Sequence, residues 1–107
     1  MFLQLERYVE NMNLRKFNTS EEQMIPNCRF TYKKIRDLII RNGKIIDENE
    51  EEKIYVFTIQ SGKLRNEAVV AMGMQEHDVY MVAYAKEGLI KQQTCERALE
   101  QMREVLE

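Results

Sequence analysis

Hydrophobic residues recur at helical spacing near both ends of the chain. Close to the N-terminus they lie three or four residues apart, at Phe2, Leu5, Tyr8, Val9 and Met12. Polar residues fill most of the positions between them, so the pattern predicts an amphipathic helix over residues 2–13. The stretch TCERALEQMREVLE has the same period and predicts a C-terminal helix over residues 94–106, with Thr94 as its capping residue.

The stretch LIIRNGKII, residues 38–46, fits two different structures. Asn42-Gly43 between apolar runs is typical of a tight β-hairpin turn, whereas a glycine just past a helix closes the last turn in a left-handed conformation. The polar and apolar positions before Asn42 follow a period of 3.6 residues rather than alternating. We therefore predict a helix over residues 31–42 that ends at Gly43, with a hairpin over residues 35–48 as the alternative.

From Lys44 onward the hydrophobic pattern changes to a period of two, which is typical of strands. β-Branched and aromatic residues dominate the stretch KIYVFTI, and two later apolar runs are joined by the polar turn QEHD. Consecutive strands with short connections pair most simply as antiparallel neighbours. The predicted strands are residues 44–47, 53–60, 66–74 and 78–86. Residues 18–27 contain no such run, and we expect a loop there with one helical turn at most.

Together these elements predict an α+β, two-layer fold that spans residues 1–107 as a single domain. An antiparallel sheet of about four strands should carry two helices from the N-terminal half and one from the C-terminus. Small residues such as Ala71, Gly73, Ala83 and Ala85 would let a helix approach the sheet closely. The pattern does not decide which face of the sheet the helices cover.

The charge balance limits the partners that we expect. The chain has 16 Lys and Arg against 18 Asp and Glu, so broad binding to nucleic acid or to an anionic membrane is not expected. No apolar run approaches the roughly 18 residues of a membrane-spanning helix, and the stretch MFLQLERYVE lacks the pattern of a signal peptide. We therefore expect a cytoplasmic protein in which Cys28 and Cys95 are reduced and serve as small core residues.

Residues with catalytic or metal-binding chemistry are few and scattered. The single histidine, His77, is followed by Asp78 in a predicted turn, where neighbouring side chains usually point apart. One histidine and two separated cysteines do not make a zinc site, and the acidic residues 47–52 lack the pattern of a calcium loop. We therefore predict no enzyme activity, no metal and no cofactor. A concave pocket that gathered His77 with Cys28 or Cys95 would favour an enzyme instead.

A basic segment supports a second hypothesis. Six Lys and Arg against one Asp give residues 29–44 a local charge of +5, six minus one. If it is helical, this segment with the strand and acidic loop that follow resembles the recognition helix and wing of winged-helix DNA-binding domains. The resemblance implies phosphate contacts from Lys33, Lys34, Arg36 and Arg41. Residues 47–52 would repel phosphate, so nucleic-acid binding is the alternative hypothesis.

The leading hypothesis is a non-catalytic protein-interaction or dimerisation module. Methionine most often fills irregular cores, but it is also favoured on surfaces that accept partners. Pairing of two copies through a sheet face, an edge strand or the C-terminal helix needs no catalytic residues. The residues predicted to anchor such an interface are Met72, Met74, Tyr80, Met81, Tyr84 and Met102.

Overall fold

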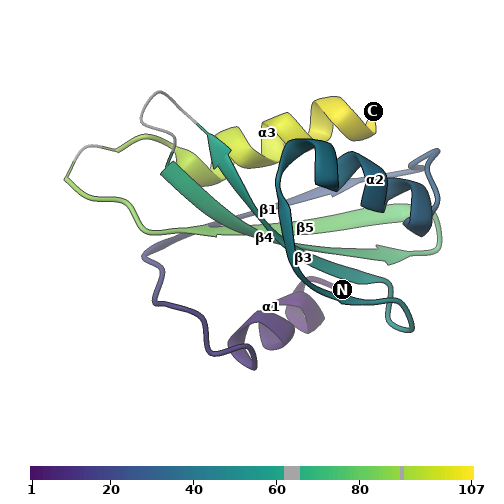
Figure 1. Cartoon of the computed structure of the whole chain (residues 1–107), viewed down its shortest axis with the longest axis horizontal. Helices are drawn as coiled ribbons and strands as arrows, with labels where there is room; N and C mark the ends of the chain where they lie inside the picture. The colour runs from purple at the N-terminus through teal and green to yellow at the C-terminus, as the bar shows by residue number, and fades with distance from the viewer. Residues whose placement is uncertain (62–65, 90) are drawn as a thin grey trace.

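The computed structural model describes residues 1–61, 66–89 and 91–107, which form one antiparallel sheet and three helices (Figure 1). The elements in chain order are α1 (Phe2–Glu10), β1 (Thr19–Ile25), α2 (Tyr32–Asn42), β2 (Lys44–Asn49), β3 (Ile54–Ser61), β4 (Asn66–Gln75), β5 (Asp78–Ala85) and α3 (Thr94–Leu106). The strands lie in the order β1-β5-β4-β3-β2. β1 and β2 are therefore the two edges of the sheet.

Helices α2 and α3 lie together on one face of the sheet, and α1 lies on the other (Figure 1). This arrangement confirms the α+β, two-layer class, with α1 as an additional cover on the second face and with five strands where about four were predicted. At 9, 11 and 13 residues, no helix in the described part of the chain is long and apolar enough to cross a membrane.

The fifth strand, β1, corrects the prediction of a loop over residues 18–27. It pairs along its whole length with β5, from Thr19 opposite Ala85 to Ile25 opposite Val79. Its sequence, TSEEQMI, shows almost no apolar alternation, because an edge strand buries little and only Ile25 is fully buried. Its pairing with a distant, strongly apolar strand therefore decides its conformation, and local pattern does not.

The stretch around Asn42 and Gly43 is a helix followed by a strand, so the hairpin alternative is wrong. The Thr31 side chain caps α2 by accepting a hydrogen bond from the Lys34 backbone N–H, at 3.2 Å. Gly43 ends the helix, but its φ of −163° is extended rather than left-handed as predicted. The reason for glycine is space, because a Cβ atom at Gly43 would overlap the carbonyl oxygen of Thr58 in β3.

Two clusters of buried side chains fill the two faces. The larger cluster lies under α2 and α3, and its largest members come from alternate positions of β3, such as Tyr55 and Phe57. The smaller one lies under α1, where Leu5 and Val9 contact the side chains that point the other way, including Val56. The sheet is thus apolar on both sides at its centre, as the continuous apolar run in β3 predicts.

Helix α3 begins differently from the prediction. Thr94 does not cap it; the cap is the carboxylate of Glu87, which accepts hydrogen bonds from the backbone N–H groups of Thr94, at 2.6 Å, and Gln92, at 3.2 Å. The Asn18 side chain holds the Glu87 backbone through two further bonds, at 2.8 and 2.9 Å. These N–H donors lower the pKa of Glu87, whose side chain is buried.

Candidate binding surfaces

Most of the predicted interface residues lie inside the protein. Met72, Met81 and Met102 are at most 1% exposed and Met74 is 9% exposed, and all four belong to the cluster under α2 and α3. They pack within the chain itself and offer no surface to a partner in this arrangement.

The two predicted tyrosines lie apart from these methionines, on the face that α1 covers. The ring of Tyr80 contacts Phe2 edge-on, with centroids 5.2 Å apart, and the ring of Tyr84 contacts Phe17 at 5.6 Å. Both tyrosines are half-buried by the N-terminal segment. The six predicted residues therefore do not form one surface.

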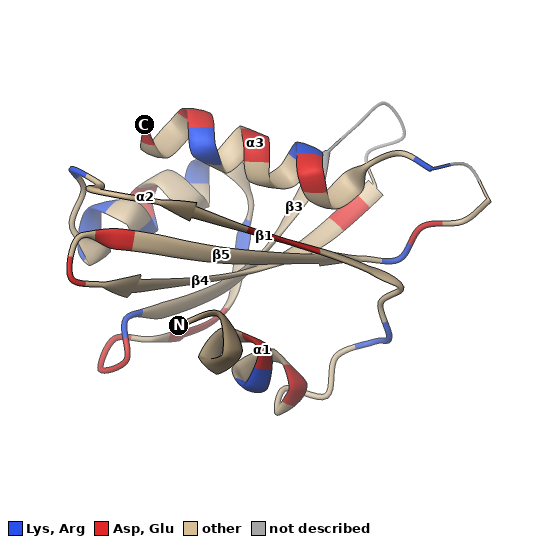
Figure 2. Cartoon of the chain, turned by 180° about the vertical axis from the view of Figure 1, so that it is seen from behind, with Lys and Arg blue, Asp and Glu red and all other residues tan. Residues whose placement is uncertain are grey.

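The four basic residues predicted for phosphate binding are all exposed on α2. Arg36 already has a partner, because its guanidinium donates to both carboxylate oxygens of Glu48, at 2.9 and 3.3 Å. Figure 2 shows basic residues on α2 and acidic ones in the turn after β2. The element before α2 is strand β1 rather than a helix, so the helix pair of a winged-helix domain is absent from the described chain.

The side of the molecule formed by α2 and β2 carries exposed apolar residues. We define the α2–β2 edge as Arg36, Ile40, Ile46 and Glu48. Ile40 is 51% exposed and Ile46 is 38% exposed. Because Arg36 reaches Glu48 on β2, and Ile40 follows Arg36 by four residues on the same helix stripe, Ile40 also faces the outer side of β2. Ile46 is the extra residue of a β-bulge between Ile45 and Asp47.

A cavity of about 280 Å³ lies at the end of the molecule where α2 begins. Its lining comes from residues 28–32, from Lys53, and from Met74, Glu76 and His77. We call it the Cys28 cavity. It gathers Cys28 with His77, as the sequence analysis required of an enzyme pocket, but the described structure contains no hydrogen bond between that thiol and that imidazole.

Hydrogen bonds join the walls of the Cys28 cavity to each other. The Cys28 backbone N–H donates to the His77 carbonyl oxygen at 2.7 Å, and the Met74 backbone N–H donates to the Lys53 carbonyl oxygen at 3.1 Å. The Tyr32 hydroxyl donates to the Ile54 carbonyl oxygen at 3.0 Å. Three segments that are far apart in sequence are thus fixed around one space.

A stacked pair of tyrosines supports the start of α2. The rings of Tyr32 and Tyr55 are nearly parallel, with centroids 4.1 Å apart, and the Tyr55 hydroxyl donates to the Tyr32 carbonyl oxygen at 2.7 Å. Burial raises the pKa of both hydroxyls, so both stay protonated as donors. A ring stack and two hydrogen bonds therefore hold the cavity wall formed by Tyr32.

Cys95 lies elsewhere, in the first turn of α3, and belongs to the larger core cluster. Its sulfur is 3.5 Å from the Thr19 hydroxyl oxygen, and burial raises the pKa of the thiol. Both cysteines are free and buried. Across the described ranges, no three His, Cys, Asp or Glu side chains come together as a metal site would require.

Comparison with known proteins adds no relative: no protein-family model, no curated protein and no solved structure matches this chain. Sequence patterns do not reveal the Cys28 cavity, because its lining comes from three connections between elements. The one sequence signal for it was the pair of predicted turns before Ile54 and around His77, which an antiparallel sheet places at the same end.

Proposed function

We propose that the protein is a non-catalytic, cytoplasmic self-association module, in which two copies pair through the α2–β2 edge. The observation that carries this proposal is the exposure of two large apolar side chains, Ile40 on α2 and Ile46 on the edge strand β2, which Arg36 of the same helix reaches. Exposed apolar residues that cluster, rather than scatter singly, are typical of contact surfaces.

The two edges of the sheet differ in their capacity for pairing with a second copy. β1 carries Glu21 and Glu22 side by side, both exposed, and antiparallel self-pairing would bring these like charges together. β2 carries a lysine at its start and acidic residues at its end. Like charges therefore oppose contact between two copies at β1, whereas the charges of β2 allow it.

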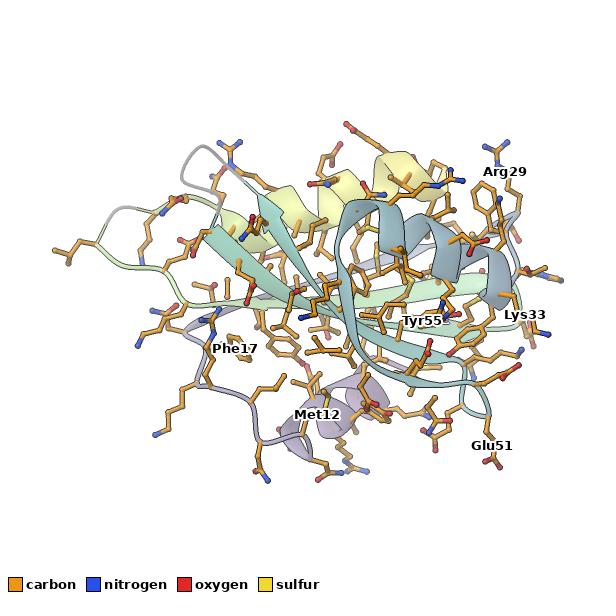
Figure 3. The ribbon with its side chains drawn as sticks, in the orientation of Figure 1. Met12, Phe17, Arg29, Lys33, Glu51 and Tyr55 are labelled. Carbon is orange, nitrogen blue, oxygen red and sulfur yellow. The ribbon has the colours of Figure 1, made fainter. Side chains whose placement is uncertain are left out.

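The charges along the α2–β2 edge are complementary to themselves. Arg41 and Lys44 lie where β2 begins, and the acidic residues 47–52 lie where it ends, near the start of α2, where Figure 3 shows Glu51 and Lys33. A two-fold axis through the middle of β2 would run the two edges antiparallel. Each basic end would then face the acidic end of the other copy, which favours this orientation over the parallel one.

The β-bulge at Ile46 determines what kind of contact this can be. A bulge interrupts the ladder of backbone hydrogen bonds, so a continuous ten-stranded sheet is not expected. Instead, Ile40 and Ile46 would pack against their counterparts across the axis, with charged residues around them. Such an interface is small, and we expect a reversible dimer rather than a permanent one.

Sedimentation velocity across a range of protein concentrations tests the dimer. We expect the average sedimentation coefficient of the native protein to rise with concentration, and Ile40→Glu to remove the rise. Leu3→Glu is the matched control, because Leu3 is 58% exposed on α1, away from the edge. A native protein that stays monomeric up to high micromolar concentration would show the proposal to be wrong.

A charge exchange tests the orientation. Arg41→Glu or Glu51→Arg alone should weaken the dimer, because each places like charges across the axis. The double variant restores opposite charges and should recover dimerisation, whereas it would stay weak if the edges were parallel. Neither residue belongs to the internal Arg36–Glu48 ion pair.

Nucleic-acid binding through α2 predicts a different result. Fluorescence anisotropy with a labelled DNA duplex would then show binding that weakens steeply with salt and is lost in the Lys33→Gln/Lys34→Gln variant. We expect no such binding, because the acidic turn borders these lysines.

A further inference from the structure

The Cys28 cavity has the properties of a ligand site whether or not the protein self-associates. We propose that it binds a small organic anion with an apolar body. The cavity contains a cationic rim, an apolar interior and walls that are held in place before any ligand arrives. Each of these features comes from a different part of the chain.

The rim of the cavity is positively charged. Arg29 and Lys53 line it together with His77, and the carboxylate of Glu76 is the one acidic group among the lining residues. The Arg29 guanidinium lies 4.8 Å from the centroid of the Phe30 ring, and the Lys53 ammonium lies 5.6 Å from the centroid of Tyr32. Both cations thus rest on aromatic rings. The Arg29 guanidinium also donates to the Glu107 backbone oxygen at 3.4 Å, and its remaining N–H groups, like the Lys53 ammonium, can donate hydrogen bonds to an anionic group.

The interior of the cavity is apolar. Cys28, Tyr32 and Met74 are each less than a tenth exposed, and they form its deeper lining. A volume of about 280 Å³ suits a molecule of metabolite size. The apolar part of the ligand would contact these side chains, while its charged group would remain at the rim (Figure 3, near Arg29).

The backbone around the cavity is held in a costly conformation. Five described residues other than glycine have a positive φ, and three of them border this cavity: Asn27 at 52°, Lys53 at 58° and Glu76 at 58°. Asparagine tolerates this left-handed region, but lysine and glutamate are strained in it, and glycine would relieve the strain. Lys53 and Glu76 both lie in hairpin turns, where the turn geometry requires a positive φ, and the chain places a charged side chain at each of them.

The two strained residues provide a matched pair of variants. Lys53→Gly and Glu76→Gly remove the same kind of backbone strain, so their effects on Tm should be small and similar. Their effects on an anionic ligand should be opposite. Lys53→Gly removes a rim cation and Glu76→Gly removes the rim carboxylate, so we expect Kd to rise about fivefold in the first and to fall about twofold in the second.

Three probes of similar shape and different charge test the ligand class: benzoate, benzyl alcohol and benzylamine. Titration followed by amide chemical shifts should show the tightest binding for benzoate and the weakest for benzylamine. The shifted signals should be those of residues 28–32 and 74–77. The Lys34→Gln variant is the control, because Lys34 is an exposed cation of α2 outside the cavity.

The proposal would be overturned by any of three results. Benzoate could fail to shift these amides, all three probes could bind alike, or Lys53→Gly and Glu76→Gly could change the Kd of benzoate in the same direction. A monomeric protein would overturn the self-association proposal and leave this one intact, so the failures of the two proposals are distinguishable.

Discussion

The two faces of the sheet are closed in different ways, and the difference shows where the stability of the protein lies. On one face, helices of 11 and 13 residues cover a continuous cluster of side chains from all of the inner strands. On the other, a helix of nine residues covers a smaller cluster near the middle of the sheet. Buried apolar area is the main source of stability, so the first face should dominate the free energy of unfolding.

The sequence of β3 shows why the faces differ. Towards α2 and α3 it presents Tyr55, Phe57 and Ile59, all at most 1% exposed. On the face that α1 covers it presents Ile54 and Val56 and then the polar Thr58, so the apolar row of β3 is shorter on that face. Helix α1 therefore rests on a short apolar strip and should open more easily than the rest of the fold.

The largest expected effect on the free energy of unfolding comes from truncating the core. Phe57→Ala and Leu5→Ala each remove a fully buried side chain, one from each face of the sheet. Phe57→Ala should lower the free energy of unfolding by about 3–5 kcal/mol. Leu5→Ala should lower the free energy of unfolding by no more than the free energy that holds α1 on the sheet, about 2 kcal/mol, because the helix can detach while the sheet persists. Urea denaturation measures both, and hydrogen exchange should show faster exchange confined to α1 in Leu5→Ala. Equal losses would mean that the two faces unfold as one unit.

Replacing one of two glycines by alanine compares the two faces in another way, because each substitution adds a methyl group next to one of the helical layers. In Gly43→Ala the new Cβ meets the backbone oxygen of Thr58, which cannot move without disturbing the sheet, so we expect a loss of about 2–3 kcal/mol. In Gly73→Ala the nearest atom is the Met1 sulfur at 2.8 Å, the flexible end of a side chain in the α1 layer. That loss should be below about 1 kcal/mol. Thermal unfolding of both variants measures the difference, and a larger loss for Gly73→Ala would contradict a loosely held α1.

Sequence patterns predicted the elements that bury a periodic apolar face. Helix α3 has the predicted bounds, Thr94 to Leu106, and the four predicted strands are present with bounds that differ by at most two residues. Strand β1 escaped prediction because its partner decides its conformation: five of its seven residues are polar, and its pairing with β5 joins residues about 60 positions apart. No local pattern carries that information.

The binding surfaces were less predictable than the fold. The sequence does not distinguish a methionine in the core from a methionine on a contact surface. Met72, Met81 and Met102 are core residues. The exposed Ile40 stands next to the buried Ile39 in an apolar run, so sequence alone does not separate them. The Cys28 cavity depends on which connections meet at one end of the sheet, which is a property of topology.

A smaller effect concerns the start of α3. Glu87→Gln keeps the shape of the capping side chain but removes its charge and one acceptor, so we expect a loss of about 1–2 kcal/mol at neutral pH. The folded pKa of Glu87 lies below its ordinary value, chiefly through the hydrogen bond from the Thr94 backbone N–H. The stabilisation that the Glu87 carboxylate provides is therefore complete above the pKa that this group has in the unfolded protein. It is lost as the pH falls through the lower pKa that the group has in the folded protein.

Urea denaturation at several pH values tests this capping role. The difference between the native protein and Glu87→Gln should shrink as the pH drops below about 4. Glu96→Gln is the control, because Glu96 is an exposed residue in the first turn of the same helix. A difference that did not depend on pH would show that shape, rather than charge, makes Glu87 a cap.

The smallest expected effect returns to the weaker face. The Tyr8 hydroxyl donates to the Asp47 carboxylate at 2.8 Å and joins α1 to β2. Tyr8→Phe should weaken the docking of α1 by about 1 kcal/mol, which hydrogen exchange would detect as faster exchange of the α1 amides. Burial and then the Asp47 hydrogen bond raise the pKa of Tyr8 from 10 to about 12, so its stabilisation is present below pH 10 and is lost as the pH rises towards 12. The exchange rates of α1 in the native protein and in Tyr8→Phe should therefore differ below pH 10 and converge over that interval. If the hydroxyl contributed nothing to docking, the two rates would be equal at every pH.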